Sequence, residues 1–265
     1  TPNRPLISDL DSLPFPAWEL FPFHKYTFVT RKKSFSLPIM TSRGCIFRCI
    51  YCYRVCGEKH RFRSAQSIIS EILYLIKNFN IKEFIFLDDF FGADENRAIE
   101  ICDEIIRHNI NIPWRIISLA VNSTTRRLLE KLHEAGCYQI GVEVESGNQN
   151  VLDYIGRNII LSQVEKILCF AKKVGLQTVT YAMIGNLSEN ENTIDETINF
   201  IIKLNPDYAQ FKITMPYPGT EMYNIIKKEG VMLTEKWENF PIYGGVAAFK
   251  HNDLAPQLLY RKYKQ

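Results

Sequence analysis

The chain has 265 residues, of which 46% are hydrophobic, 23% charged and 12% aromatic. This composition is that of an ordinary globular protein and excludes collagen-like and disordered chains. The formal charge of +3 is spread along the chain and gives no argument for a nucleic-acid or membrane surface. We find no apolar run near the roughly 20 residues of a spanning helix, and no signal peptide.

The N-terminal stretch is rich in proline, with five of the twelve prolines in residues 1–22. Proline fixes φ and removes a backbone donor, which predicts an extended lead-in or linker over residues 1–35. We place the main domain at residues 36–235 and a C-terminal extension at residues 236–265. Because position 1 is Thr and the last residues resemble a helix cut short, we expect an excerpt or a processed product.

From about residue 36, short β-branched and aromatic runs alternate with helical patterns. The runs predict strands at Leu37–Thr41, Glu83–Leu87, Trp114–Leu119, Tyr138–Val144, Gln177–Ile184 and Tyr208–Ile213. Helices are predicted at 64–79, 95–108, 124–135, 162–174, 190–203 and 220–229. The alternation predicts an α/β fold with a parallel sheet, in the form of a partial (β/α)6 barrel or a doubly wound sheet. In either form, ligands bind at the carboxyl ends of the strands.

Two of these helices are preceded by possible capping boxes. Ser162 is followed three residues later by Glu165, and Ser188 by Glu191. This spacing is typical of a serine that begins a helix. We therefore expect Ser162 and Ser188 to be N-caps.

Three of the seven cysteines, Cys45, Cys49 and Cys52, lie within eight residues directly after the first predicted strand. Thiolates at this density can surround a soft metal centre. Three ligands can hold a four-iron cluster and leave one iron free to bind a substrate or cofactor. Two alternatives stay open: a structural zinc site completed by Cys56 and His60, and a fully ligated cluster that transfers electrons.

The other cysteines and the histidines carry no comparable pattern. Cys102, Cys137 and Cys169 are expected to be small buried hydrophobic residues. The five histidines are scattered along the chain, and no residue stands out as a catalytic acid or base.

Acidic residues end two of the predicted strands. Asp88 and Asp89 follow the second strand, where adjacent carboxylates are costly unless they meet cations or donors. They predict either a receptor for an ammonium group or a cap for the helix at 95–108. In the fourth strand, Glu143 and Glu145 share one face by period-2 alternation. Glutamates on one face of a parallel strand indicate a polar cavity.

The order Cys-x3-Cys-x-aromatic-Cys after a first strand resembles the signature of the radical S-adenosylmethionine (SAM) superfamily. The resemblance covers about residues 9 to 250. The Asp88-Asp89 pair and the segment Pro14-Phe15-Pro16 are similar to the branch that often carries a cobalamin domain. The resemblance implies a partial barrel in which Cys45, Cys49 and Cys52 hold a [4Fe–4S] cluster. The reduced cluster would cleave SAM to methionine and a 5′-deoxyadenosyl radical.

The same resemblance assigns parts of SAM to individual residues. It places Tyr51 and the backbone near Gly185 against the adenine. It places Glu145 and Ser146 near the ribose. The remaining implied contacts are Arg157 with the carboxylate and the pair Asp88 and Asp89 with the amino group.

Two positions depart from the family pattern. Position 143 is commonly small in relatives, whereas this chain has Glu143. The segment from Gly185 to Glu189 is similar to the Gly-x-Pro-Gly-Glu turn of the family, but Leu187 and Ser188 replace the proline and the second glycine. We expect Glu143 to contact substrate or to face solvent.

The resemblance implies an enzyme that methylates, or closes a ring at, an unactivated carbon, with cobalamin held by a domain outside this chain. A tRNA methylthiotransferase is the alternative, and a non-catalytic metal-binding module is a third. The implied partners are a low-potential electron donor, such as flavodoxin or ferredoxin, and a small-molecule or peptide substrate. Neither nucleic acid nor a membrane span is expected. The exposed cluster implies a reducing compartment, so the expected location is cytoplasmic.

Overall fold

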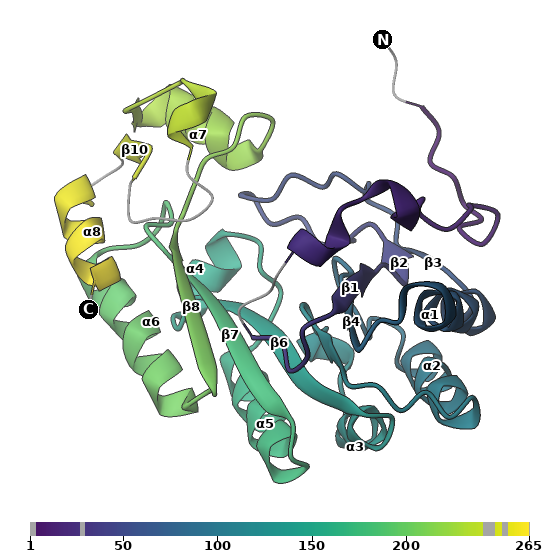
Figure 1. Ribbon diagram of the computed structural model, residues 1–265. Helices are drawn as coiled ribbons and strands as arrows, with labels where there is room; N and C mark the ends of the chain where they lie inside the picture. The colour runs from purple at the N-terminus through teal and green to yellow at the C-terminus, as the bar shows by residue number, and fades with distance from the viewer. Residues whose placement is uncertain (1–3, 27–29, 241–246, 251–253, 265) are drawn as a thin grey trace. The chain divides into compact units, whose positions relative to one another are not determined.

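A computed structural model describes residues 4–26, 30–240, 247–250 and 254–264 (Figure 1). Six strands form one sheet in the order β1-β4-β5-β6-β7-β8. The pairs β1–β4, β4–β5, β5–β6 and β7–β8 are parallel, which confirms the predicted parallel α/β sheet. The six strands are β1 (Ser36–Ile39), β4 (Glu83–Phe86), β5 (Trp114–Ile116), β6 (Cys137–Glu145), β7 (Gln177–Ile184) and β8 (Tyr208–Ile213).

The order of these strands in the sheet follows their order in the chain. A doubly wound sheet reverses its direction at a switch point, and this sheet has no such reversal. The sheet is therefore wound in one direction, as in a (β/α) barrel. None of the helices in the described ranges is long and apolar enough to cross a membrane.

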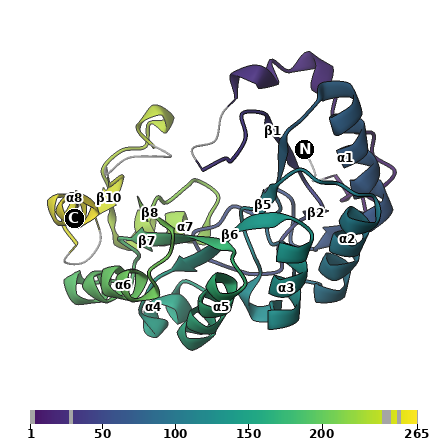
Figure 2. The ribbon, with the colours of Figure 1, turned by 60° about the horizontal axis from the view of Figure 1, so that its bottom comes forward.

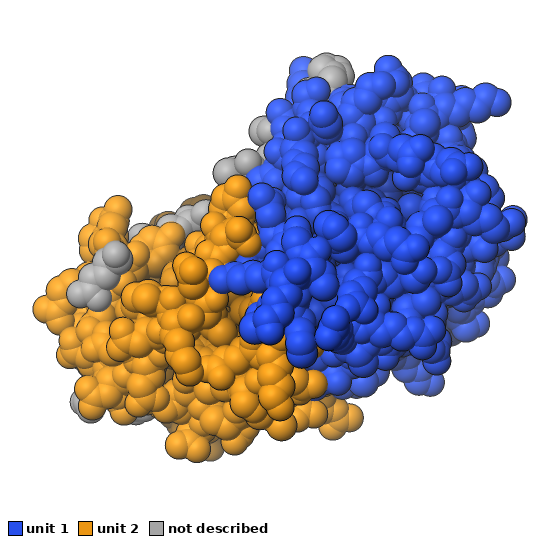
Figure 3. All heavy atoms as spheres, turned by 90° about the horizontal axis from the view of Figure 1, so that it is seen from below, with its two compact units in different colours: residues 1–46, 56–142, 169–178 blue, residues 47–55, 143–168, 179–265 orange. Residues whose placement is uncertain are grey.

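The chain divides into two compact units (Figure 3). Unit 1 contains residues 1–46, 56–142 and 169–178, and unit 2 contains residues 47–55, 143–168 and 179–265. The segment with the three clustered cysteines passes from one unit into the other. Cys45 belongs to unit 1, whereas Cys49 and Cys52 belong to unit 2.

In unit 1, the helices α1 (Ala65–Phe79), α2 (Glu95–Arg107) and α3 (Arg126–Glu134) lie side by side (Figure 2). The core beside them is aromatic: the rings of Phe84 and Trp114 are nearly parallel, with centroids 5.7 Å apart. A short antiparallel pair flanks the cysteine segment. The elements of unit 1 besides its sheet strands are η1 (Trp18–Leu20), η2 (Phe23–Lys25), β2 (Ser42–Arg43), β3 (Arg61–Phe62), α1 (Ala65–Phe79), α2 (Glu95–Arg107), η3 (Val121–Ser123) and α3 (Arg126–Glu134).

In unit 2, Ile184 on β7, Ile194 on α6 (Glu191–Leu204) and Leu259 on α8 (Pro256–Lys264) pack into one buried cluster. The helix α5 begins in unit 2 and ends in unit 1. The elements here are α4 (Gln149–Tyr154), α5 (Leu161–Lys173), α6 (Glu191–Leu204), α7 (Glu221–Glu229), β9 (Val231–Met232), η4 (Trp237–Asn239), β10 (Phe249–Lys250) and α8 (Pro256–Lys264).

The predicted capping boxes are wrong. Helix α5 begins at Leu161, so Ser162 lies inside its first turn. Helix α6 is capped by Asn190, whose side chain accepts from the backbone of Thr193 while the Thr193 hydroxyl accepts from the backbone of Asn190. Asparagine is as strong an N-cap as serine, and it stands two residues closer to the helix than Ser188.

Two other predictions need correction. Strand β5 ends at Ile116 rather than at Leu119, because Leu119 forms only an isolated bridge with Phe91. Cys102 and Cys137 are buried as expected, but Cys169 is exposed. Its place on α5 gave a helical pattern, and the pattern alone did not distinguish the two faces.

Candidate functional site

The three clustered cysteines lie on an irregular segment between β2 and β3. None of the seven cysteines is in a disulfide. Within the described ranges, no three His, Cys, Asp or Glu side chains converge as metal ligands. The thiol donor set still fits an iron–sulfur cluster, because three soft ligands lie within eight residues. Each half of the segment is held by its own unit.

In unit 1, Asp88 fixes the chain where it enters the cysteine segment. Its Oδ1 accepts from the backbone N–H of Thr41 at 2.6 Å and of Ser42 at 3.3 Å. Its Oδ2 accepts from the Ser42 hydroxyl at 2.8 Å and from the Thr41 hydroxyl. Burial raises the pKa of Asp88, and these hydrogen bonds oppose the shift. The carboxylate is therefore fully occupied by the end of β1 and the start of β2.

Asp89 continues this anchoring one step along the chain. Its Oδ2 accepts from the backbone N–H of Gly44 at 2.9 Å, and the next N–H, of Cys45, donates to the carbonyl of Gly57 at 3.2 Å. Gly44 has φ +92°, and a Cβ there would lie 2.3 Å from the carbonyl oxygen of Lys59. Only glycine fits this close, left-handed turn.

The acidic pair is not a helix cap, because Asp94 caps α2 with its own side chain. The polar surroundings of Asp88 extend instead to His60, whose Nε2 lies 3.1 Å from the Ser42 hydroxyl. Burial and the charge of Arg97 lower the pKa of His60. His60 is therefore a neutral partner of this hydrogen-bond network.

In unit 2, the segment around Cys49 rests on the turn that follows α4. The Cys49 Sγ lies 3.5 Å from the carbonyl of Gly156, and the N–H of Ile50 donates to Ile155 at 3.0 Å. Gly156 has φ +70°, and a Cβ there would lie 2.8 Å from the carbonyl oxygen of Arg48. Cys49 is buried, whereas Cys52 is exposed.

A buried polar cluster lies beside this segment in unit 2. Arg157 is 5% exposed and donates from Nη2 to the carbonyl of Glu143 at 3.0 Å, with the Glu143 carboxylate 3.4 Å away. Glu145 raises the pKa of Tyr51, while Tyr51 and the charge of Lys212 oppose the rise in the pKa of Glu145. The structure thus brings together three residues that the sequence singled out separately: Tyr51, Glu145 and Arg157.

Glu145 combines two unusual properties. It is a non-glycine residue with φ +66°, which costs of order 1–3 kcal/mol. Burial, and then the charge of Glu143, raise its pKa to about 7. Strain and a perturbed carboxyl at the end of a parallel strand are typical of a functional site.

Ser146, next in the chain, is fully buried. Its hydroxyl lies 3.1 Å from that of Thr197 on α6 and accepts from the N–H of Asn148 at 3.2 Å. These contacts close the turn after β6. A role of Ser146 in ribose binding stays a prediction.

The turn after β7 leaves buried polar atoms without partners. Glu189 accepts at one oxygen from the N–H groups of Gly185 and Asn186, at 2.6 and 2.8 Å, and burial raises its pKa to about 7. Its other oxygen, the Asn186 Nδ2 and the Ser188 hydroxyl are buried and have no hydrogen-bond partner in the described part of the chain. Such atoms fit a ligand with both donors and acceptors, as in the edge of an adenine.

Sequence reasoning missed several of these residues. Asn186 and Lys212 carried no signal that separated them from ordinary loop and strand residues. Thr41 and Ser42 lie beside the cysteine motif, and only the fold shows that they are the donors to Asp88. Period-2 alternation did place Glu143 on the polar face, but its pairing with Arg157 joins two different elements.

Comparison with known proteins gives a consistent assignment. A model of the radical SAM superfamily matches residues 39–201. An uncharacterized methyltransferase of Pyrococcus horikoshii is 34% identical over 94% of this chain and 54% of its own length. The anaerobic magnesium-protoporphyrin IX monomethyl ester cyclase of Rubrivivax gelatinosus is 26% identical over 84% of this chain and 40% of its own length. The chain thus spans about half the length of these relatives.

A solved structure shares the fold. The radical SAM methyltransferase TsrM of Kitasatospora setae, solved with cobalamin and a [4Fe–4S] cluster, superposes with a TM-score of 0.63 at 20% identity. The match covers 70% of this chain and 35% of that one. The predicted partial barrel is therefore confirmed.

Proposed function

Because this chain belongs to the radical SAM superfamily, we propose that it is the radical-generating part of an enzyme that modifies an unactivated carbon. Methyl transfer and ring closure are the two reactions that the similar proteins support. We propose further that cobalamin takes part, held by a part of the protein outside this chain, as the likeness to a cobalamin-binding methyltransferase suggests.

The observation that carries the proposal is the anchoring of the cysteine segment. Asp88 and Asp89, at the carboxyl end of β4, hold the backbone that leads into Cys45. Carboxyl ends of parallel strands are where barrel enzymes place their chemistry. When bound, the cluster and SAM supply a one-electron cleavage that yields methionine and a 5′-deoxyadenosyl radical.

In this proposal Cys45, Cys49 and Cys52 hold the cluster. The two aspartates have different roles. Both oxygens of Asp88 accept hydrogen bonds and position the segment. Asp89 is exposed, and only one of its oxygens accepts from the N–H of Gly44. Asp89 is thus the carboxylate that would receive the amino group of SAM.

In this proposal, residues of unit 2 bind the carboxylate, the ribose and the adenine of SAM. Arg157, held by Glu143, would pair with the carboxylate of SAM. Glu145, whose carboxyl interacts with Tyr51, would bind the ribose hydroxyls. The turn at Gly185 would contact the adenine.

The chemistry needs an electron from outside the chain. A flavodoxin or ferredoxin in a reducing compartment, the cytoplasm, would supply it. The substrate is a small molecule or a peptide in this proposal.

The test is anaerobic reconstitution with iron and sulfide, reduction, addition of SAM and quantification of 5′-deoxyadenosine. We expect the parent chain to form it and Cys49→Ala to lose it. Cys169→Ala, on an exposed cysteine of α5, is the matched control and keeps the activity. A chain that assembles a four-iron cluster but neither binds nor cleaves SAM would contradict the proposal.

A further inference from the structure

Resting on the proposed function, we propose that a pocket in unit 1 binds a substrate with an apolar body and one anionic group, and that Arg43 pairs with the anion. None of the residues that we propose to hold the cluster or SAM lines this pocket.

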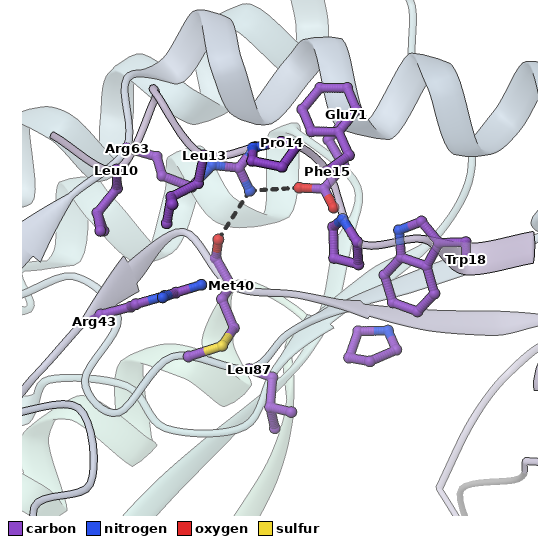
Figure 4. A pocket seen from close by; sticks show the side chains of 12 residues that line it. Leu10, Leu13, Pro14, Phe15, Trp18, Met40, Arg43, Arg63, Glu71 and Leu87 are labelled. Atoms are coloured by element: carbon purple, nitrogen blue, oxygen red, sulfur yellow. Dashed lines mark hydrogen bonds and ion pairs between the residues drawn. The ribbon is translucent and has the colours of Figure 1, made fainter. Parts of the chain in front are cut away.

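The pocket has a volume of about 520 Å³, within the range of about 300–1,000 Å³ for small-molecule sites. One wall is the N-terminal segment 10–18. The other wall is formed by Pro38 and Met40 at the end of β1 and by Leu87 at the end of β4 (Figure 4). The pocket thus opens at the carboxyl ends of two parallel strands, where the reacting group is expected.

The N-terminal wall is tied to the unit. Leu10 is 3% exposed, and the carboxylate of Asp11 accepts from the N–H of Ser64 at 3.0 Å. The ring centroids of Phe15 and of Tyr74 on α1 lie 5.7 Å apart. The wall is therefore held at its start and in its middle, as a preformed ligand site requires.

The charges in the lining leave one cation uncompensated. Arg63 and Glu71 form a buried ion pair and neutralise each other. Arg43 is exposed, and the structure gives its guanidinium no hydrogen bond or ion pair within the described residues. Figure 4 shows its side chain directed toward Met40 and the pocket. A carboxylate or a similar anion would supply the missing partner.

A second polar group in the lining also lacks a partner. The Nε1 of Trp18 is buried and makes no hydrogen bond in the described part of the chain. A buried donor without an acceptor is unfavourable, but this atom is closed off from solvent, so a ligand in the pocket does not reach it. The pocket offers a ligand an apolar surface and one guanidinium, which disfavours a cationic ligand.

The probe for this chemistry is 8-anilinonaphthalene-1-sulfonate, which has an apolar body and one anionic group. Its neutral counterpart is N-phenyl-1-naphthylamine, which lacks the sulfonate. Binding of both to the reconstituted chain is measured by equilibrium dialysis. We expect Arg43→Gln to weaken the sulfonate about tenfold, the effect of losing one charge-assisted hydrogen bond, and to leave the neutral probe unchanged.

Three further variants separate the pocket from general effects. Arg43→Lys keeps the charge and should keep most of the sulfonate affinity. Leu87→Trp fills the pocket and should weaken both probes. Arg127→Gln, on an exposed arginine of α3, is the matched control and should change neither. Equal sulfonate binding by the parent and Arg43→Gln, or full binding of both probes by a folded Leu87→Trp, would overturn the proposal.

The assay for 5′-deoxyadenosine separates this proposal from the proposed function. SAM cleavage without charge-selective probe binding would overturn the pocket and leave the function. Charge-selective binding by a chain that assembles a four-iron cluster but neither binds nor cleaves SAM would support the anion pocket and overturn the function.

Discussion

The Arg157 guanidinium contacts Glu143 twice, through the backbone carbonyl at 3.0 Å and through the carboxylate at 3.4 Å. One residue thus fixes both the position and the charge balance of a buried cation. Burial alone would lower the pKa of Arg157, and the charge of Glu143 is the largest opposing effect. The arginine stays charged and oriented in the chain without a ligand.

Glu143→Gln should lower the free energy of unfolding by about 1–3 kcal/mol, because Arg157 loses its carboxylate partner while buried. This loss is smaller than the loss expected for a fully buried ion pair, since the Glu143 side chain is 30% exposed. Urea denaturation of the cluster-free chain measures it. Glu165→Gln breaks the exposed pair with Lys203 and should cost less than about 1 kcal/mol. Equal losses for both variants would contradict the positioning of Arg157 by Glu143.

Asp88→Asn should reduce both stability and iron content. The variant keeps the volume of the side chain but replaces one accepting oxygen with a donor, which faces the donors of Thr41 or Ser42. We expect a loss of about 2 kcal/mol in the free energy of unfolding. After reconstitution, the variant should hold less iron per chain than the parent. Asp103→Asn, on an exposed side chain of α2, controls for the loss of charge, and unchanged iron in both variants would contradict the anchoring role.

The sheet could be predicted from the sequence because its signals are local. Strands β7 and β8 have the predicted bounds, since each is a run of β-branched and aromatic residues between turn residues. The cysteine motif and the polar face of β6 were likewise visible as spacing. Helix starts were less predictable, because Asn190 and Ser188 are both good caps and only the backbone path decides between them.

The pairings within the site could not be predicted, because they join residues far apart in the chain. Asp88 and Thr41 are 47 positions apart, and their contact depends on β1 and β4 being neighbours in the sheet. The pocket beside Arg43 depends on how the N-terminal segment packs. A proline-rich composition predicts an extended chain, but it does not show which surface that chain covers.

Gly44→Ala should distort the entry to the cysteine segment. Its Cβ would lie 2.3 Å from the carbonyl oxygen of Lys59, at φ +92°. We expect a loss of about 2–4 kcal/mol in the free energy of unfolding, with reduced iron uptake. Gly92→Ala is the control, because Gly92 also has a positive φ, +80°, but the nearest atom would be 3.4 Å away. It should cost about 1–2 kcal/mol from backbone strain alone and leave iron uptake intact. Equal iron uptake by both variants would show that the close contact at Gly44 does not matter.

The buried Glu189 should make the stability of the cluster-free chain depend on pH. Its pKa is raised by burial from 4.5 to about 7, so between these values the folded chain keeps a proton that the unfolded chain releases. The contribution of Glu189 to the free energy of unfolding therefore falls by up to about 3 kcal/mol as the pH rises from about 4.5 to about 7. Above pH 7 this contribution is constant. Glu189→Gln stays neutral and can still accept from Gly185 and Asn186.

The variant should therefore match the parent in stability near pH 4.5 and exceed it near pH 7.5, as measured by urea denaturation at several pH values. Glu238→Gln, on an exposed side chain of η4, should leave the pH dependence of the parent unchanged. A constant difference between Glu189→Gln and the parent across this range would mean that Glu189 is ionised throughout. Its second oxygen would then need a partner in the folded chain. The fit of this turn to an adenine edge would lose its main support, because that fit depends on an unsatisfied oxygen.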